Sequence, residues 1–332
     1  MLQNDDGPPG RDSPYIYGLC RHLTDDLGWD VKVVIPSSQK SWIGKAYQIT
    51  EIIHGRYFYP RGPDGLEGET SDISRPLKDG ETAEWVLLDG TPATCANIAL
   101  HNLYPGQIDL LLSGPNLGRN SSAAFSLSSG TIGAALSSSL SKTRSIALSY
   151  GTVIHPTPTE FFQPAHLLST RIIKYLWDNW GTDDGGLRNN EVDLYNVNIP
   201  MIQELLSDKG LDIYWTKIWR NTYGRLFKAH ATSKPATSPA GPDSLNEPPV
   251  ELGEDAQKDE EKDKLVFKFA PDIAPLINPT KASLPAGSDA WAISNGWASV
   301  TPLRASFAEP TGVAEPQETV QQLDKRLWKM KL

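Results

Sequence analysis

The chain has 332 residues and is acidic, with 31 Lys and Arg against 40 Asp and Glu and a formal net charge of −9. No dense basic stripe occurs, which argues against a nucleic-acid duplex as the main partner, because binding to a phosphate backbone relies on clustered cations. No apolar run approaches membrane-spanning length, and no basic segment followed by an apolar stretch opens the chain. We therefore expect a soluble, cytoplasmic protein without a membrane partner.

The first half of the chain alternates apolar runs with helical patterns. Met1 and Leu2 form a very short apolar lead, and Ser13 with Pro14 predicts the start of a helix that stops near Gly28. Further strands are expected at 31–35, 108–112, 145–148 and 194–200, and further helices from Thr91 to about Leu103 and after Gly130. This alternation predicts an α/β fold with a parallel sheet core flanked by helices. In such sheets ligands collect beyond the carboxyl ends of the strands.

The second half is less regular. Residues 230–264 are rich in proline and then almost wholly charged, and no aromatic residue occurs between Phe227 and Phe267. Such a segment cannot bury enough apolar surface to offset the entropy lost on ordering, so the sequence predicts a disordered acidic insertion. A solvated loop is the preferred interpretation, and a regulatory role is the alternative. The chain is then expected to form one domain over 1–305, interrupted by 230–264, and a tail over 306–332. Residues 317–332 in that tail predict an amphipathic helix that packs on the body or on a second subunit.

The two cysteines, Cys20 and Cys95, each fall on the apolar face of a predicted helix. They are interpreted as small buried hydrophobic residues rather than as a disulfide or a metal-binding pair.

A pair of adjacent carboxylates, Asp5 and Asp6, follows the apolar lead, with Asn4 before it and Gly7 after it. Oxygen ligands at this density suit a hard divalent cation such as Mg²⁺, Mn²⁺ or Ca²⁺. The same residues also form ordinary turns, because Asp accepts backbone hydrogen bonds and Gly adopts positive φ. A cation site therefore needs support from a second motif.

Three further motifs are expected at the same edge of the sheet. Residues 113–120 follow a buried strand, and the Asn116 carbonyl oxygen can bind a hard cation, although a Gly/Asn-rich turn is an alternative. Ser129, Gly130 and Thr131 open a helix, where N–H groups and hydroxyls attract anions; an ordinary serine cap is the alternative. Ser41 presents a hydroxyl from a loop or is simply solvated. The spacing fits neither a dinucleotide fingerprint nor a P-loop.

These motifs together resemble the SurE family of metal-dependent nucleoside monophosphate phosphatases. The resemblance covers 1 to about 225 and 265 to 305, and residues 41–46 together with the Pro8-Pro9 start resemble its fungal-type branch. The matching segments, in order, are residues 4–7, 34–41, 89–95, 113–120, 129–135, 196–200, 288–291 and 296–303.

The resemblance implies a Rossmann-like core and a smaller C-terminal part that supports a homodimer or tetramer. It implies that Asp5, Asp6, Ser41 and Asn116 hold a divalent cation, Mg²⁺ or Mn²⁺. It further implies that Asn120 and the helix start at Ser129, Gly130 and Thr131 face the phosphate of a small phosphorylated substrate, and we add Asn4 to this phosphate-binding set. Asp5 or Asp6 is the expected acceptor of a proton from the attacking water.

The chain departs from the family pattern at its first strand. Only three residues precede Asn4, where the family has a full apolar strand, and Gln3 stands in place of an apolar residue. The main hypothesis is a 5′/3′-nucleotidase or broad acid phosphatase. The alternative is a weak or inactive scaffold of the same fold that binds phosphate or nucleotide. A covalent aspartyl-phosphate mechanism is disfavoured, because such enzymes commonly carry Asp-x-Asp after the first strand.

Overall fold

The computed structural model describes residues 1–152, 156–229, 265–272, 274–277 and 279–308. Its strands are β1 Leu2–Gln3, β2 Val33–Pro36, β3 Gly55–Tyr59, β4 Glu69–Ser71, β5 Trp85–Leu88, β6 Leu110–Leu117, β7 Arg144–Thr152, β8 Leu194–Met201, β9 Ile213–Trp215, β10 Phe227–Ala229, β11 Phe267–Phe269 and β12 Ala298–Leu303. Its α-helices are α1 Ile16–Asp25, α2 Pro92–Ile98, α3 Ser122–Ser128, α4 Gly130–Leu140, α5 Phe162–Asp178, α6 Ala274–Ile277 and α7 Asp289–Ser294. Short helical turns lie at Ala99–Leu103, Thr159–Phe161, Gln203–Leu206 and Lys281–Ser283.

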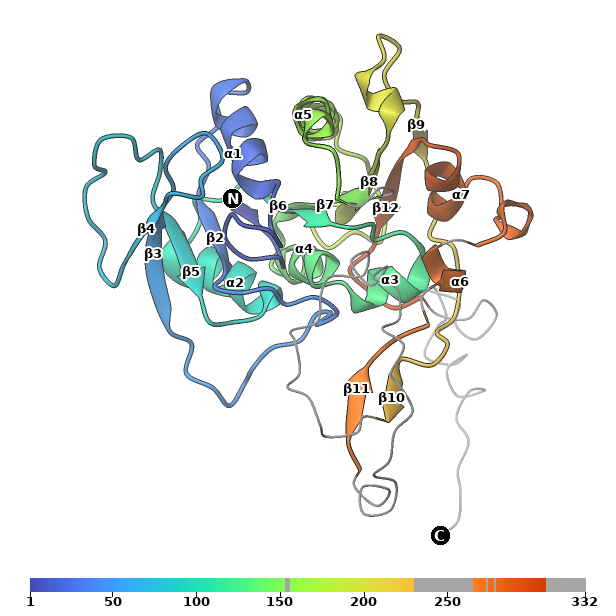
Figure 1. The fold of residues 1–332 in the computed structure, drawn as a ribbon, viewed down its shortest axis with the longest axis horizontal. Helices are drawn as coiled ribbons and strands as arrows, with labels where there is room; N and C mark the ends of the chain where they lie inside the picture. The colour runs from blue at the N-terminus through green and yellow to red at the C-terminus, as the bar shows by residue number, and fades with distance from the viewer. Residues whose placement is uncertain (153–155, 230–264, 273, 278, 309–332) are drawn as a thin grey trace, which may run out of the picture.

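A single ten-stranded sheet organises the molecule, in the order β4-β3-β5-β2-β1-β6-β7-β8-β12-β9 (Figure 1). Within the central run β5-β2-β1-β6-β7-β8 every pair of neighbouring strands is parallel. Outside this run, β3 pairs antiparallel with β5, and β12 pairs antiparallel with β8. The predicted parallel core is therefore confirmed, with antiparallel strands added on both sides. The strands β10 and β11 form a separate two-stranded antiparallel sheet that projects away from the large one (Figure 1).

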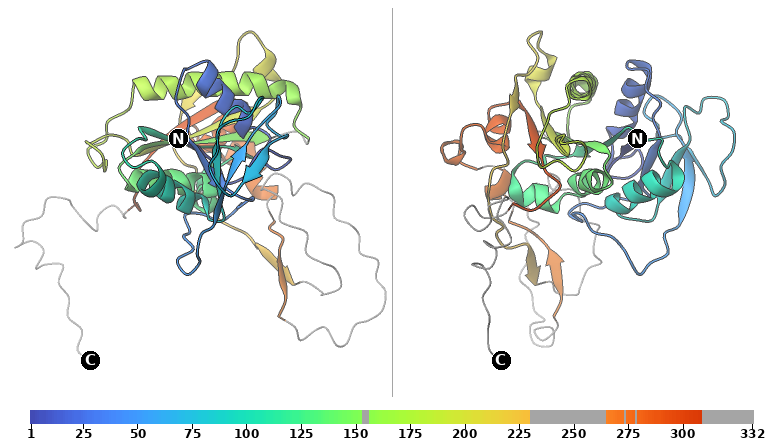
Figure 2. Two further views of the ribbon diagram at one scale, coloured as in Figure 1. Left: turned by 90° about the vertical axis from the view of Figure 1, so that its left-hand side faces the viewer. Right: turned by 180° about the vertical axis from the view of Figure 1, so that it is seen from behind.

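Helices cover both faces of the sheet, as Figure 2 shows. Helices α1 and α5 lie over one face, and their apolar side chains join the largest core cluster together with residues of the central strands. Helices α2 and α4 lie over the other face, where Cys95, Ala99, Ile132 and Ala135 are buried. Cys20 and Cys95 are both buried and free, as the sequence predicts, and burial raises the pKa of the Cys20 thiol to about 12.

The first strand is short but central. β1 has two residues and lies between β2 and β6, and Leu2 pairs with Val33 on one side and Leu112 on the other. Gln3 is fully buried, and its amide donates a hydrogen bond to the Ser113 hydroxyl on β6. The polar residue at this position therefore cross-links two neighbouring strands.

Several boundaries differ from the predictions. The first helix begins at Ile16 rather than Ser13, because the Ser13 hydroxyl accepts a hydrogen bond from the Asn4 side chain instead of capping a helix. Residues 113–117, expected in a loop, continue β6 through a register shift between Ser113 and Asn116. Glycine is required at this bulge, since a Cβ on Gly114 would lie 2.0 Å from the Leu148 carbonyl oxygen. The sequence analysis also missed α3, α5 and the strands β3, β4 and β5.

Two helix starts agree with their predictions. The Thr91 hydroxyl accepts a hydrogen bond from the Thr94 N–H at 3.1 Å, and the Ser129 hydroxyl accepts one from the Ile132 N–H at 3.2 Å. Both are ordinary side-chain caps of a helix N-terminus. The helix from Thr91 reaches Leu103 as predicted, although its last turn, Ala99–Leu103, is a π-helix.

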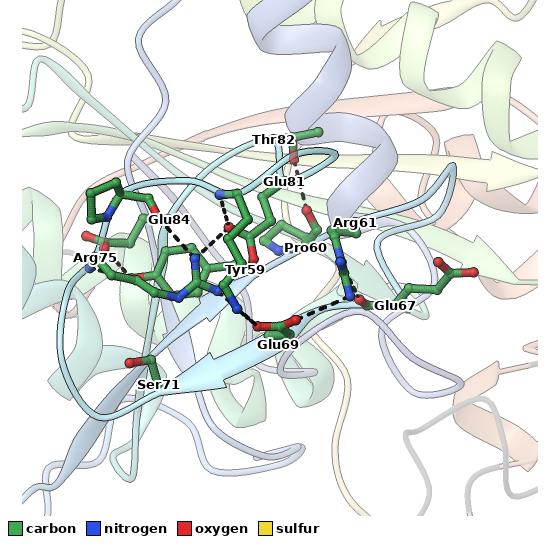
Figure 3. Close-up of polar contacts among 12 residues, drawn as sticks. Tyr59, Pro60, Arg61, Glu67, Glu69, Ser71, Arg75, Glu81, Thr82 and Glu84 are labelled. Carbon is green, nitrogen blue, oxygen red and sulfur yellow. Dashed lines mark hydrogen bonds and ion pairs between the residues drawn. The ribbon is translucent and has the colours of Figure 1, made fainter.

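An ion-pair cluster fastens the outer strands β3 and β4 to the loop between β4 and β5 (Figure 3). The Arg75 guanidinium forms two hydrogen bonds to the buried Glu81 carboxylate, at 2.6 and 2.7 Å, and a further one to Glu69 at 3.2 Å. The same guanidinium lies over the Tyr59 ring, 3.8 Å from its centroid. We refer to Tyr59, Glu69, Arg75, Lys78 and Glu81 as the edge cluster.

Some predictions lie outside the described residues, namely the disordered insertion at 230–264 and most of the tail at 306–332 with its helix. Within the described part of the chain, no helix combines the length and apolar character that crossing a membrane requires.

Candidate metal and phosphate site

One open pocket lies where the carboxyl ends of the central strands meet. Asp5 reaches it from the end of β1, Ser41 from the loop after β2, and Asn116 from β6. The full lining is Asp5, Ser41, Trp42, Asn116, Asn120, Phe125, Ser128 and Ser129. The structure therefore brings together residues that the sequence predicted from four separate segments.

The Asp5 side chain is buried against the first turn of helix α4. Its carboxylate accepts a hydrogen bond from the Thr131 hydroxyl at 2.5 Å. Burial raises the pKa of Asp5 to about 6, and this rise is partly offset by hydrogen bonds from the Thr131 side chain and from N–H groups of the helix start. Part of the helix start predicted to bind an anion thus donates hydrogen bonds to the Asp5 carboxylate.

Asp6 is buried beside Asp5 and does not line the pocket. Its Oδ2 accepts a hydrogen bond from the Leu117 N–H at 2.8 Å, which ties it to the end of β6. Burial raises the pKa of Asp6 well above its ordinary value, and repulsion from Asp5 raises it further. The two carboxylates thus form an acidic pair without an ion-pair partner among the described residues.

Asn116 follows the bulge in β6 and is 3 % exposed. Its Nδ2 donates a hydrogen bond to the Gly118 carbonyl oxygen at 2.6 Å. This bond orients the amide and leaves the side-chain oxygen without a hydrogen-bond donor in the described part of the chain. A carbonyl oxygen in this state suits a hard cation.

Asn120 is fixed by a network of buried polar residues. Its N–H donates to the Asn198 Oδ1 at 2.7 Å, and its Nδ2 donates to the Ser149 hydroxyl at 2.8 Å. Its carbonyl oxygen accepts from the Asn196 Nδ2 at 2.9 Å. Two asparagines of β8 and one serine of β7 therefore hold Asn120 at the pocket wall.

The Asn4 side chain makes its hydrogen bonds within the loop that follows β1. Its Nδ2 donates to the Gly7 carbonyl oxygen and the Ser13 hydroxyl, and its Oδ1 accepts from the Gly7 N–H. The side chain thus braces the loop after β1 and does not line the pocket.

Gly130 fits closely against the site, because a Cβ there would lie 2.9 Å from the Asp5 Cβ. Its predicted role toward phosphate, like that of Asn4, stays a prediction.

The donor set fits a hard divalent cation. Two buried carboxylates without a cationic partner carry a large desolvation cost that a bound cation would offset. In the predicted set, Asp5 and Asp6 would supply anionic oxygens, Asp6 from outside the pocket lining, and Ser41 and Asn116 would supply neutral ones. Within the described ranges no group of three or more His, Cys, Asp or Glu side chains could hold a metal ion. Only two carboxylates belong to the expected set, so the neutral oxygens would have to complete it.

The sequence analysis did not identify Trp42, Phe125 and Ser128 as pocket residues. Asp289 belongs to the matching segment 288–291 but was given no role there; its buried carboxylate accepts hydrogen bonds from the N–H groups of Ser122 and Trp219, at 2.7 and 2.9 Å. Asn196 and Asn198, within the otherwise apolar run at 194–201, could have indicated the polar network around Asn120. A buried polar residue usually has a specific partner. No local sequence pattern indicates that Trp42 and Phe125 lie next to each other in the pocket lining.

The fold and its edge residues define an α/β protein of Rossmann-like architecture with an acidic pocket beyond its parallel strands. The family model described as "Survival protein SurE" matches residues 1–225. The chain belongs to the SurE family.

Relatives in this family include named 5′-nucleotidases. The 5′-nucleotidase SurE of Acinetobacter baylyi is 28% identical over 92% of this chain and 92% of its own length. The yeast (Saccharomyces cerevisiae) protein named "Probable tubulin--tyrosine ligase PBY1" is 35% identical over 68% of this chain but only 32% of its own length. The 5′-nucleotidase SurE of Desulforamulus reducens is 29% identical over 45% of this chain and 50% of its own length. The chain thus spans from about a third to a half of the length of the first relatives that it matches.

A solved structure supports the fold. The SurE protein from Aquifex aeolicus has a TM-score of 0.55 to this chain, with 23% identity over 92% of this chain and 93% of its own. This likeness confirms the predicted SurE-like architecture.

Proposed function

We propose that this protein is a metal-dependent phosphomonoesterase that hydrolyses nucleoside monophosphates, as a 5′/3′-nucleotidase or as a broader acid phosphatase. The observation that carries the proposal is the buried pair of Asp5 and Asp6, which has no cationic partner among the described residues and lies beside a polar pocket. The family supports it, because several relatives bear the name 5′-nucleotidase.

Each residue has a distinct part in the proposed reaction. Asp5, Asp6, Ser41 and Asn116 hold a divalent cation, Mg²⁺ or Mn²⁺, which when bound polarises the phosphoryl group and lowers the pKa of water. Asn120 and the start of α4 bind the phosphate oxygens and orient the ester. Asp5 or Asp6 accepts the proton of the attacking water.

The cellular setting is part of the same proposal. The substrate is a small phosphorylated molecule rather than a nucleic-acid duplex, the protein acts in the cytoplasm, and it assembles as a homodimer or tetramer. A second candidate function is a weak or inactive scaffold that binds phosphate or nucleotide. The observation that favours this alternative is that Asp6 does not line the pocket, so only one carboxylate, that of Asp5, faces it among the described residues.

The test is phosphate release from a panel of nucleoside monophosphates and an aryl phosphate, after chelation and after adding back Mg²⁺ or Mn²⁺. We expect release that is lost on chelation and restored by one of the metals. Metal-independent release would contradict the proposed site. A folded protein that binds AMP but releases no phosphate would favour the scaffold.

A further inference from the structure

Asn120, which lines the pocket, is held at its backbone by two side chains of one strand. Asn196 and Asn198 lie two residues apart on β8, so both side chains point to the same face of the sheet. Both are fully buried. The proposed function assigns a phosphate contact to Asn120 and no part to these two asparagines.

Three hydrogen bonds join these residues into a closed ring. The Asn120 N–H donates to the Asn198 Oδ1 at 2.7 Å, the Asn198 Nδ2 donates to the Asn196 Oδ1 at 3.4 Å, and the Asn196 Nδ2 donates to the Asn120 carbonyl oxygen at 2.9 Å. A backbone N–H can only donate, and a backbone carbonyl oxygen can only accept. The backbone of Asn120 therefore dictates which way round each amide lies, and the ring closes in one direction only.

The connection in which Asn120 lies has no regular structure of its own. Asn120 comes between the end of β6 at Leu117 and the start of α3 at Ser122, so neither strand pairing nor helical hydrogen bonds hold its backbone. The ring provides partners for both the N–H and the carbonyl oxygen of this residue. The Ser126 hydroxyl donates a further hydrogen bond to the same carbonyl oxygen at 3.1 Å. The position of Asn120 thus depends on side chains, above all on those of β8.

The Asn120 side chain is held by a neighbouring strand. Its Nδ2 donates to the hydroxyl of Ser149 on β7 at 2.8 Å, and Ser149 is fully buried. Ser149 is in register with Asn198 of β8 on one side and with Asn116 of β6 on the other. A row of buried polar side chains thus crosses β6, β7 and β8, which lie side by side in Figure 1. The proposed cation ligand Asn116 belongs to the same row as the ring.

We propose that Asn196 and Asn198 are positioning residues, because the ring sets where the Asn120 side chain stands in the pocket and thereby how Asn120 contacts phosphate. Neither asparagine of β8 lines the pocket, so both act through Asn120. This inference rests on the proposed function, since it depends on Asn120 binding the phosphate. It also gives a reason for two polar residues in a strand whose eight residues are all buried.

A double-mutant cycle on kcat/KM for AMP tests whether Asn198 acts through Asn120. Loss of a residue that orients a binding side chain is costly, so Asn198→Ala should lower kcat/KM roughly 10- to 100-fold. In the Asn120→Ala background no side chain remains to be positioned, and Asn198→Ala should change kcat/KM little. Losses that multiply in the double variant would overturn the inference and assign Asn198 to stability alone.

A second variant covers the case in which Asn198→Ala does not fold. Asn196→Ala opens the ring at the Asn120 carbonyl oxygen, which keeps its hydrogen bond from the Ser126 hydroxyl. The same cycle with Asn120→Ala should show the same coupling. Independent losses in this cycle would contradict the positioning role as well.

Ser299→Ala is the matched control. Ser299 of β12 is in register with Asn198 and fully buried, and its hydroxyl has no hydrogen-bond partner in the described part of the chain. The variant removes a polar group beside the ring without opening it, so kcat/KM should remain that of the wild type. A loss equal to that of Asn198→Ala would show that any change on this buried face lowers activity, and it would overturn the inference.

Phosphate binding separates this inference from the proposed function. Calorimetry with inorganic phosphate in the presence of Mg²⁺ needs no turnover. We expect Asn198→Ala and Asn120→Ala each to weaken phosphate binding roughly 10-fold, and the double variant to bind no worse than Asn120→Ala. If the wild type hydrolyses no ester but shows this pattern, the proposed function fails and the positioning role stands. If the wild type hydrolyses AMP and a folded Asn198→Ala is equally active, the function stands and the positioning role is wrong.

Discussion

Two groups of carboxylates in this molecule have opposite electrostatic surroundings. In the pocket, burial raises the pKa of Asp5 to about 6, and Asp6 beside it is raised as well. In the edge cluster, the hydrogen bonds from Arg75 lower the pKa of Glu81 to about 2 (Figure 3). Both Asp5 and Glu81 are buried side chains.

The difference lies in whether the fold supplies a cation. Glu81 receives the Arg75 guanidinium and the Lys78 N–H, so its charge is balanced within the chain. Asp5 and Asp6 receive neutral donors, Thr131 and Leu117, and each lies beside another anion. A buried charge without a partner is disfavoured unless something from outside balances it. The first arrangement suits structural support, and the second suits cation binding.

The largest expected effect is that of Asp5→Asn. Loss of a metal ligand removes several kcal/mol of transition-state stabilisation, so we expect roughly 1000-fold lower turnover. Added Mg²⁺ or Mn²⁺ should raise the thermal midpoint of the wild type but not that of the variant. In chelator the variant should be at least as stable as the wild type, because it lacks one of two repelling buried charges. Asp109→Asn, an exposed carboxylate at the opposite end of β6, is the control, and a matching loss there would contradict the site.

Gly133→Ala tests whether close packing positions the pocket loop. Alanine ordinarily stabilises a helix interior by about 1 kcal/mol relative to glycine. Here its Cβ would meet the Gly44 carbonyl oxygen at 2.3 Å and the Lys45 Cα at 2.9 Å. We expect the loop with Ser41 to shift and kcat/KM to fall roughly 100-fold. Gly224→Ala, where a Cβ meets open space, should leave kcat/KM unchanged; a more stable and fully active Gly133→Ala would rule out this packing role.

Glu81→Gln should affect stability and leave metal binding intact. The pKa of Glu81 is lower in the folded state than in the unfolded chain, so its ionised form stabilises the fold above pH of about 4.5. That stabilisation is lost as the pH falls toward about 2. Denaturant titrations should therefore show a lower unfolding midpoint for the variant at pH 7 and converging midpoints near pH 2. A difference that persists undiminished at pH 2 would show that the ion pair is not its cause.

Lys78→Ala should have the smallest effect. The Lys78 ammonium lies 2.6 Å from Glu69, but both side chains are substantially exposed, and exposed ion pairs contribute little. The Lys78 N–H that binds Glu81 belongs to the backbone and is retained. We expect a thermal midpoint within error of the wild type. A loss as large as that of Glu81→Gln would mean that the exposed part of the edge cluster matters as much as its buried part.

Much of the site could be predicted because its residues occur in local motifs. Asp5, Ser41, Asn116, Asn120 and Ser129 were expected at one edge of the sheet, and all of them line one pocket. The strand from 113 to 117 was mistaken for a loop because Gly and Pro usually mark turns. The backbone stays in β6 because pairing with β7 resumes beyond the bulge.

The sequence by itself determined the α/β alternation, the serine and threonine caps, and the order of the motifs, because these depend on residues close together in the chain. Only the tertiary structure decided that Gln3 bonds to Ser113, that Asp289 holds the start of α3, and that Trp42 meets Phe125. These contacts join residues far apart in the chain. They follow from strand order and helix packing, which local periodicity does not encode.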